Sequence, residues 1–465
     1  MNFNSPQFFL FLPTVVLLYA LVFRRASVRD VLLLAVSYVF YMSWNWRYAG
    51  LILLSTVVDY SIGRRLSHET RERVRKSLLV TSLVTNLGLL GIFKYYNFFL
   101  DVGGSALSLF GMDLEFMRHR LLLPVGISFY TFQTLSYTID LYRRKIPHER
   151  SFIKFALFVS FFPQLVAGPI VRASQFLPQL HRKPAFTEQR FNTGLTLIFR
   201  GLFKKIVIAD MLAGLGVDAV FANPAAFSSL DLLLAVYGYS FQIYADFSGY
   251  SDIAIGAARM LGYDLVINFN RPYLAQNVRE FWTRWHISLS TWLRDYLYIP
   301  LGGSRASPAR VKFNLMITML LGGLWHGAAL NFIFWGGWHG LLLIFARGAS
   351  KSPEASLAVR IRRRFLCFHL ITFSWLLFRA GSWELLVDYV KGLVAFSGGS
   401  VLHPLFFFTL ALAFLTHFVS KDWVDRTLEG FARLPAVVQS GAYAAMILLL
   451  VGLTFGSPAF IYFQF

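Results

Sequence analysis

Cysteine is almost absent from this 465-residue sequence, which contains Cys367 alone. A single chain therefore cannot form a disulfide, a cysteine-held iron–sulfur centre or a zinc site of several cysteines. No pair of histidines or cysteines has zinc-site spacing either, so no metal site is predicted. Cys367 lies beside an apolar run, and we expect it only to pack there.

Charged residues are also scarce. They make up 15% of the chain, against 56% hydrophobic and 17% aromatic residues, and the mean hydropathy is +0.55. A soluble globular chain carries about 25% charged residues. Because a membrane-spanning helix needs about 20 apolar residues, this chain has room for on the order of ten spans. The composition predicts an all-α polytopic membrane protein.

Acidic residues are few relative to basic ones, 24 against 44, which gives a net charge of +20. Such an excess also occurs in nucleic-acid-binding proteins, but here the basic residues form short clusters between apolar runs. That pattern is typical of cytoplasmic loops beside an anionic lipid bilayer. No nucleic-acid partner is therefore expected, and the order of the first clusters places the N-terminus outside. The clusters lie at 24–29, 64–76, 143–145 and 360–364.

The apolar runs set the expected helices. The first, at 6–23, lacks a basic leader and a small-residue cleavage site, so we interpret it as a retained span. Pro163, Gly168, Pro169 and Pro178 predict short, kinked or re-entrant helices in the middle of the chain. The sequence has no internal repeat, and residues 1–465 are expected to form one membrane-embedded domain. Further runs cover 31–41, 51–62, 78–93, 121–142, 193–212, 230–255, 315–324, 332–345, 365–378, 405–418 and 442–455.

His326 lies near the end of an apolar stretch, residues 319–327, without a basic cluster beside it. Polar residues inside apolar runs are costly and are functional candidates. Desolvation favours the uncharged imidazole, which is the form that a general base needs to take a proton from an attacking hydroxyl. Position alone leaves a hydrogen-bonded packing histidine equally open. The glycines that would allow a close approach of helices or substrate are Gly322, Gly323, Gly327 and Gly336.

His286 lies in the segment 280–296, where large apolar residues recur every three or four positions. This spacing predicts one amphipathic helix that lies in the interface or re-enters the membrane. His286 falls beside the apolar face, so it can point inward; a histidine at headgroup level is the alternative. The apolar face consists of Trp282, Trp285, Leu289, Trp292 and Tyr296.

His339 follows His326 by 13 residues. On a single helix the two side chains would point about 220° apart, and Asn331 with the glycines is expected to break that helix. His339 is therefore predicted to be structural. Two other patterns are incomplete: residues 249–252 lack the second glycine of a nucleophile elbow, and residues 302–304 lack the lysine of a phosphate loop.

The most specific patterns are EFWTRWHISLS at 280–290, LRDYLYIPLGG at 293–303, LLGGLWHG at 320–327 and WHG at 338–340. They are accompanied by PVGISFY at 124–130, AGP at 167–169, YADFSGYSD at 244–252 and FIYF at 460–463. Together these motifs resemble the bacterial branch of the membrane-bound O-acyltransferase (MBOAT) family, over nearly the whole chain.

The resemblance implies a catalytic role for His326 and a second catalytic histidine at His286. It also implies a ring of about ten to twelve membrane helices, with short re-entrant or interfacial helices around a central tunnel. The acyl group, from acetyl-CoA as the expected donor, would enter from the cytoplasm, and no cofactor would be bound. Substrate-binding roles are expected for Trp325, Arg284, Ser288, Arg294, Asp295 and Asp252.

The expected activity is O-acetylation of an exported polysaccharide such as alginate, at the bacterial inner membrane, with help from a periplasmic acetyltransferase partner. One alternative keeps the chemistry and transfers D-alanyl or another acyl group from a carrier thioester to teichoic acid, peptidoglycan or lipid. A different class of protein, a polysaccharide export component, is also compatible with polar residues inside the membrane.

Overall fold

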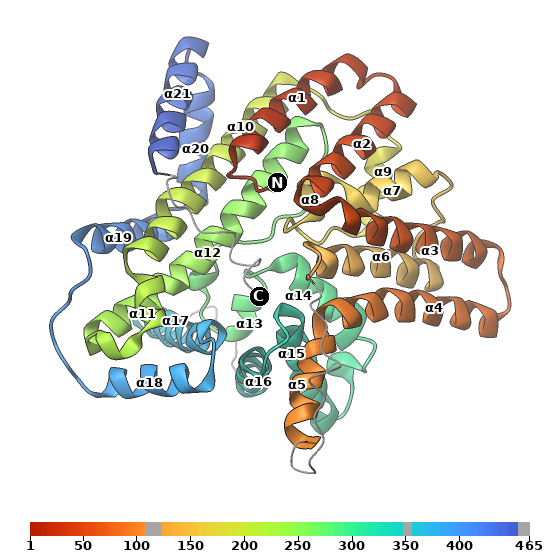
Figure 1. Cartoon of the computed structure of the whole chain (residues 1–465). Helices are drawn as coiled ribbons and strands as arrows, with labels where there is room; N and C mark the ends of the chain where they lie inside the picture. Colours follow the sequence, from red (N-terminus) through yellow and green to blue (C-terminus); the bar gives the residue numbers. More distant parts are fainter. Residues whose placement is uncertain (108–121, 347–355, 454–465) are drawn as a thin grey trace. The chain divides into compact units, whose positions relative to one another are not determined.

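The computed structural model of the protein describes residues 1–107, 122–346 and 356–453, and within these ranges the chain forms helices and turns without a strand (Figure 1). This confirms the predicted all-α class. The described chain divides into two compact units. The first contains residues 1–194, 257–266 and 327–329, and the second contains the rest. The start of the run predicted at 121–142, the end of the run at 442–455 and the FIYF motif lie outside the described residues.

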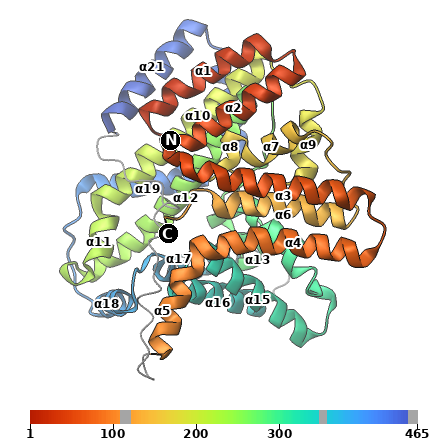
Figure 2. The same ribbon diagram turned by 45° about the vertical axis from the view of Figure 1, so that its right-hand side comes forward.

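The first unit begins with helices joined by short turns. Each apolar run predicted before residue 142 falls largely within one of them, whereas α5 has no counterpart among the predictions. In two views α3, α4 and α6 lie side by side (Figure 1, Figure 2). The helices are α1 (Pro6–Val22), α2 (Ala26–Asn45), α3 (Ala49–His68), α4 (Glu72–Leu90), α5 (Tyr96–Leu107) and α6 (Ile127–Tyr142).

A polar cluster joins α3, α4 and α6. Asp59 of α3 is fully buried, and its carboxylate accepts hydrogen bonds from Ser82 and from Asn86 Nδ2, at 2.8 Å, of α4. Thr138 Oγ1 of α6 donates to the same carboxylate at 3.1 Å, and Ser55 Oγ donates to Asn86 Oδ1 at 2.6 Å. Hydrogen bonds of this kind join helices where apolar surroundings provide little drive for association. The cluster therefore stabilises the arrangement of three helices in the first unit.

The prolines and glycines after residue 150 have the predicted effect. The chain forms the short helices α7 (Phe152–Ser160), α8 (Phe162–Leu165) and α9 (Ala173–Leu180). Pro163 lies in the first turn of α8 and Pro178 lies inside α9. Proline removes a backbone donor and restricts φ, so the helices here stay short or start anew.

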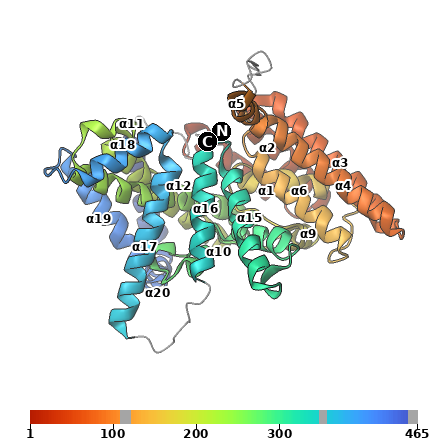
Figure 3. The ribbon, with the colours of Figure 1, turned by 90° about the horizontal axis from the view of Figure 1, so that it is seen from below.

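The second unit contains the segments with the histidine motifs. Within it, α15 and α16 pack side by side (Figure 3). Helix α10 begins in the first unit and continues here into a π-helical stretch, η5 (Phe203–Asp210). The helices are α10 (Glu188–Leu202), α11 (Asp218–Ala222), α12 (Ser229–Met260), α13 (Val278–Trp282), α14 (Ile287–Leu293), α15 (Pro308–His326), α16 (Leu330–Phe345), α17 (Leu357–Arg379), α18 (Trp383–Val394), α19 (Pro404–Phe418), α20 (Lys421–Ala432) and α21 (Ala436–Leu453).

Two helical stretches of the described chain, Ala26–His68 and Glu72–Gly104, are long and apolar enough to cross a membrane. Pro6–Val22, Leu330–Phe345 and Pro404–Phe418 are shorter apolar helices. The described chain thus has fewer long apolar helices than the roughly ten membrane spans that a chain of this length could form. Turns and π-helical stretches divide several of the predicted apolar runs. At these places the regular hydrogen bonds of the α-helix backbone are interrupted. The helices agree with a membrane protein.

Candidate active site

His326 is positioned by a close crossing of α15 and α16. A Cβ atom on Gly323 of α15 would collide with the carbonyl oxygen of Phe332, and one on Gly336 of α16 would collide with the carbonyl oxygen of Met319. Only glycine permits backbones to approach this closely, which is a common device between membrane helices. Helix α15 ends at His326 and α16 begins four residues later. The glycines therefore bring the end of one helix against the start of the next.

The imidazole of His326 lies in an aromatic enclosure. It is 5% exposed, and its ring contacts three aromatic rings edge to face. The centroid distances are 5.1 Å to Trp325, 5.1 Å to Trp335 and 5.4 Å to Phe378. Aromatic walls exclude water and fix the plane of the imidazole, both of which favour a defined direction of proton transfer.

His286 departs from the predicted structure. The segment 280–296 is not one amphipathic helix, because α13 ends at Trp282 and α14 starts at Ile287. His286 itself caps α14 with φ +40° and ψ +55°, in the left-handed region. A non-glycine residue pays about 1–3 kcal/mol for such a conformation and keeps it only where its surroundings impose it. The short helices agree with the predicted re-entrant or interfacial elements, and His286 is fully buried in the protein, so its side chain points inward.

Trp325 links the two predicted catalytic histidines. Its ring centroid lies 5.9 Å from that of His286 and 5.1 Å from that of His326, and the rings are tilted by 68° and 81°. Phe247 of α12 closes another side of His286 at 4.7 Å. The structure therefore brings His286, Trp325 and His326, three of the predicted site residues, together in the second unit.

His339 occupies a packing position. As predicted, it lies on a different helix from His326, and Asn331 at the start of α16 donates to the carbonyl oxygens of Phe378 and Ala380. The buried ring of His339 lies 4.7 Å from that of Trp335, and its Nε2 is 3.0 Å from Ser374 Oγ. These contacts agree with a structural histidine.

The other predicted substrate-binding residues are spread over several local contacts. Arg284 is paired with Glu280 at 2.8 Å, and Arg294 is paired with Asp295 at 2.6 Å. Ser288 is buried next to His286 and donates to Asn268 Oδ1 at 2.9 Å. Ser288 thus shares its partner Asn268 with the predicted catalytic histidine His286.

Asp252 belongs to a group of charged residues on α10, η5 and α12. Arg200 donates two hydrogen bonds to its carboxylate, at 2.7 and 3.0 Å, and Lys204 contacts it at 2.7 Å. The next residue of η5, Lys205, lies 2.7 Å from Asp210 and 2.8 Å from Asp246, with all three side chains at most 6% exposed. The three cations are Arg200, Lys204 and Lys205, and the three carboxylates are Asp252, Asp210 and Asp246. Their charges cancel within this group.

Removing Lys205 is expected to destabilise the second unit strongly. Lys205→Met would leave two carboxylates buried without their cation, which typically costs about 3–5 kcal/mol of unfolding free energy. Thermal unfolding of the detergent-solubilised variant measures this loss.

Lys204→Met is the matched control. Asp252 would keep its bidentate bond to Arg200, and Lys204 is more exposed than Lys205, so a loss below about 1 kcal/mol is expected. Equal melting temperatures for the two variants would contradict the assigned role of Lys205. Adding Asp246→Leu to Lys205→Met should recover part of the loss.

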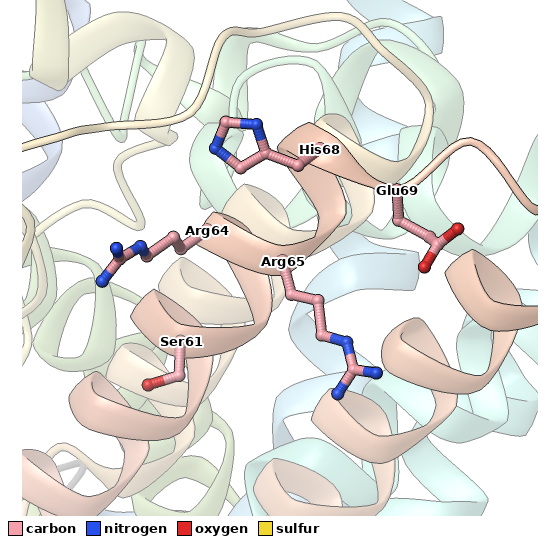
Figure 4. Close-up of a pocket in the computed structure, with 5 residues that line it drawn as sticks. All are labelled: Ser61, Arg64, Arg65, His68 and Glu69. Atoms are coloured by element: carbon pink, nitrogen blue, oxygen red, sulfur yellow. The ribbon is translucent and has the colours of Figure 1, made fainter.

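A separate hollow of about 340 Å³ lies at the end of α3 in the first unit (Figure 4). Its basic lining belongs to the cluster 64–76 that the sequence places in the cytoplasm. Hydrogen bonds from Arg71 lower the pKa of Glu69 at its edge to about 2, so this carboxyl stays ionised. The hollow includes none of the predicted site residues. It is lined by Ser61, Arg64, Arg65, His68 and Glu69.

Some residues of the site were not anticipated from the sequence. Asn268 contacts His286, Trp335 and Phe378 enclose His326, and Arg200 with Lys204 holds Asp252. The one local signal for Asn268 is that this polar residue lies between two apolar residues, Ile267 and Phe269. The others are ordinary apolar or basic residues, and their partners lie 9 to 52 residues away in the sequence.

The fold and the site describe a helical membrane protein with two histidines joined by a tryptophan in its interior. Residues 42–374 match the model of the MBOAT, membrane-bound O-acyltransferase family, and the chain belongs to that family. It is therefore an O-acyltransferase, which favours an enzyme over an export component.

Relatives with assigned names resemble the chain over most of its length. A probable alginate O-acetylase of Azotobacter vinelandii is 44% identical over 382 residues, which cover 82% of this chain and 75% of that protein. A peptidoglycan O-acetyltransferase of Helicobacter pylori is 37% identical over 440 residues, 86% of this chain and 81% of that protein. A teichoic acid D-alanyltransferase of Bacillus subtilis is 29% identical over 282 residues, 55% of this chain and 70% of that protein.

Proposed function

We propose that the protein transfers acetyl groups for the O-acetylation of an exported polysaccharide such as alginate. The observation that carries the proposal is the pair His286 and His326 around Trp325, inside the segment that matches the acyltransferase family. The likeness to probable alginate O-acetylases supports acetyl as the acyl group and a polysaccharide as the final acceptor.

In the proposed reaction, the acceptor oxygen attacks the carbonyl carbon of the acetyl thioester while His326 takes the proton from that oxygen. The carbon–sulfur bond then breaks, and the leaving thiolate takes up the proton from His326, which returns the imidazole to its neutral form. His286 orients the acceptor or receives a hydrogen bond from it. Trp325 forms a shared wall, and Arg284, Ser288, Arg294, Asp295 and Asp252 are proposed to contribute to substrate binding directly or through their neighbours.

The donor is proposed to be acetyl-CoA, which acts as a substrate and not as a bound cofactor. The basic clusters face the cytoplasm in this proposal, where they would attract the donor's phosphates and anionic lipid alike. The chain would lie in the bacterial inner membrane as a multi-pass protein, with about ten to twelve helices in a ring around a central tunnel. The continuous family match over residues 42–374 supports a single MBOAT domain, and a periplasmic acetyltransferase would take the acetyl group to the polymer.

Inner-membrane vesicles provide a direct test. Vesicles from cells with and without the protein receive acetyl-CoA labelled in the acetyl group, and the label in polysaccharide is measured. We expect polymer labelling only when the protein is present. Equal labelling in both preparations would refute the proposed activity.

Peptidoglycan is a second candidate acceptor, because the Helicobacter pylori relative covers 86% of the chain. The same vesicles distinguish the two acceptors if the label is traced separately into peptidoglycan and into secreted polymer. A D-alanyl carrier thioester in place of acetyl-CoA tests the donor of the third relative. Incorporation of D-alanine instead of acetate would overturn the acetyl assignment and leave acyl transfer intact.

A further inference from the structure

A short segment at residues 268–270 holds the turn that contains His286. The backbone N–H of Ile287 donates to the carbonyl oxygen of Asn268 at 2.9 Å, and the N–H of Asn270 donates to the carbonyl oxygen of Arg284 at 2.9 Å. These bonds flank His286 on both sides. They replace the helical bonds that a continuous 280–296 helix would make, and they impose the left-handed backbone of His286.

The side chain of Asn268 reinforces this hold. It is 1% exposed, and its Oδ1 lies 3.1 Å from His286 Nδ1, 2.9 Å from Ser288 Oγ and 3.3 Å from the backbone nitrogen of Ser288. Its Nδ2 lies 3.3 Å from Ser251 Oγ of α12. One buried amide thus connects the histidine, the start of α14 and α12.

These contacts determine which atom of the amide faces the histidine. A backbone N–H can only donate, so the Asn268 atom that faces the Ser288 nitrogen must be the carbonyl oxygen. The same oxygen faces His286 Nδ1, so Nδ1 must carry a hydrogen. In a neutral imidazole with Nδ1–H, the lone pair that accepts a proton or a hydrogen bond is on Nε2.

We infer that Asn268 is a positioning residue for the acyl-transfer reaction, which fixes His286 in the Nδ1–H tautomer and directs its basic Nε2. This inference rests on the proposed role of His286. Partners of this kind act through the histidine and not on the substrate, in the way that outer-shell groups orient metal-bound histidines. Asn268 would therefore affect turnover more than the binding of the acyl donor.

Asn268→Leu and Asn268→Asp separate positioning from packing. Leucine removes the acceptor from Nδ1–H, so kcat is expected to fall about 10- to 100-fold with little change in KM. Aspartate keeps an acceptor in place and should restore turnover at high pH. Its carboxylate favours the charged imidazole, so the acid limb of the pH–rate profile should move to higher pH.

Asn314 supplies the matched control. It is also a fully buried asparagine of the second unit, and its Nδ2 donates to the carbonyl oxygen of Gly303 at 3.4 Å. Asn314→Leu and Asn314→Asp should change the amount of folded protein without moving the pH profile. All rates are measured as release of free CoA thiol from acetyl-CoA in membrane vesicles, per mole of folded protein.

Nitrogen NMR of ¹⁵N-histidine-labelled protein adds a measurement that needs no variant at position 268. The His286 signal, assigned by its loss in His286→Gln, should show a protonated Nδ1 and an unprotonated Nε2. The opposite tautomer would overturn the inference. So would unchanged kcat in Asn268→Leu, or a wild-type acid limb in Asn268→Asp.

The experiments distinguish a failure of this inference about Asn268 from a failure of the proposed function. If His286→Gln and His326→Ala lose thiol release while the Asn268 variants keep wild-type kcat and pH profile, only the role of Asn268 fails. If the two histidine variants keep full acetyl transfer, the proposed function of the site fails.

Discussion

His326→Ala is expected to lower the rate of acetyl transfer by about 10² to 10⁴, the range typical for removal of a general base. The loss should appear in kcat, because the imidazole acts on the proton of the attacking hydroxyl in the transition state. Acetyl content per polymer, measured in cells that contain wild-type amounts of the variant, reports the effect. Undiminished acetylation would end the assignment of His326.

His339→Asn is the control for this experiment. His339 is also buried among aromatic rings of the second unit, and it is bonded to Ser374, so its replacement perturbs similar surroundings. The variant should lose stability and keep its rate per folded molecule. A comparable loss of rate in His339→Asn would show that packing around the tryptophans, and not the chemistry of His326, controls turnover.

Much of the helical structure could be predicted from the sequence because apolar runs and breakers act locally. Helices α1, α12, α16 and α19 cover the predicted runs, and Pro163 marks short helices as expected. Position 286 was harder to predict. The spacing of Trp282, Trp285 and Leu289 satisfies a helical period, and the turn at His286 depends on bonds to Asn268, 18 residues away.

The same distinction holds for the site: local motifs predict which residues belong to it, whereas contacts between distant segments are not predicted. The family motifs point to His286 and His326, and the structure brings both against Trp325. The motif predicts a substrate-binding role for Asp252, and the structure adds that Arg200 and Lys204 engage its carboxylate. No sequence pattern specifies such a pair, because the spacing between partners depends on how helices pack.

Gly336→Ala is expected to have the second large effect. The new methyl group would collide with the carbonyl oxygen of Met319 and lie 3.0 Å from its carbonyl carbon. Backbone atoms cannot rotate away, so α15 and α16 must separate. Overpacking of a close contact typically costs about 1–3 kcal/mol or more. Since α15 ends at His326, the separation should also displace the imidazole and reduce acetyl transfer at least about 10-fold, because small displacements of a reacting group are costly.

Gly337→Ala makes the same chemical change one residue later. Its methyl group would meet only Leu320 Cδ2 at 3.6 Å, an ordinary contact. Alanine has a higher helix propensity than glycine, so this variant should be unchanged or stabilised by up to about 1 kcal/mol. Gly336→Ala should therefore melt below the wild-type temperature, and Gly337→Ala should melt at or above it. If Gly336→Ala melts like Gly337→Ala but loses activity, the glycine serves substrate entry; if both remain active and stable, the close crossing does not position His326.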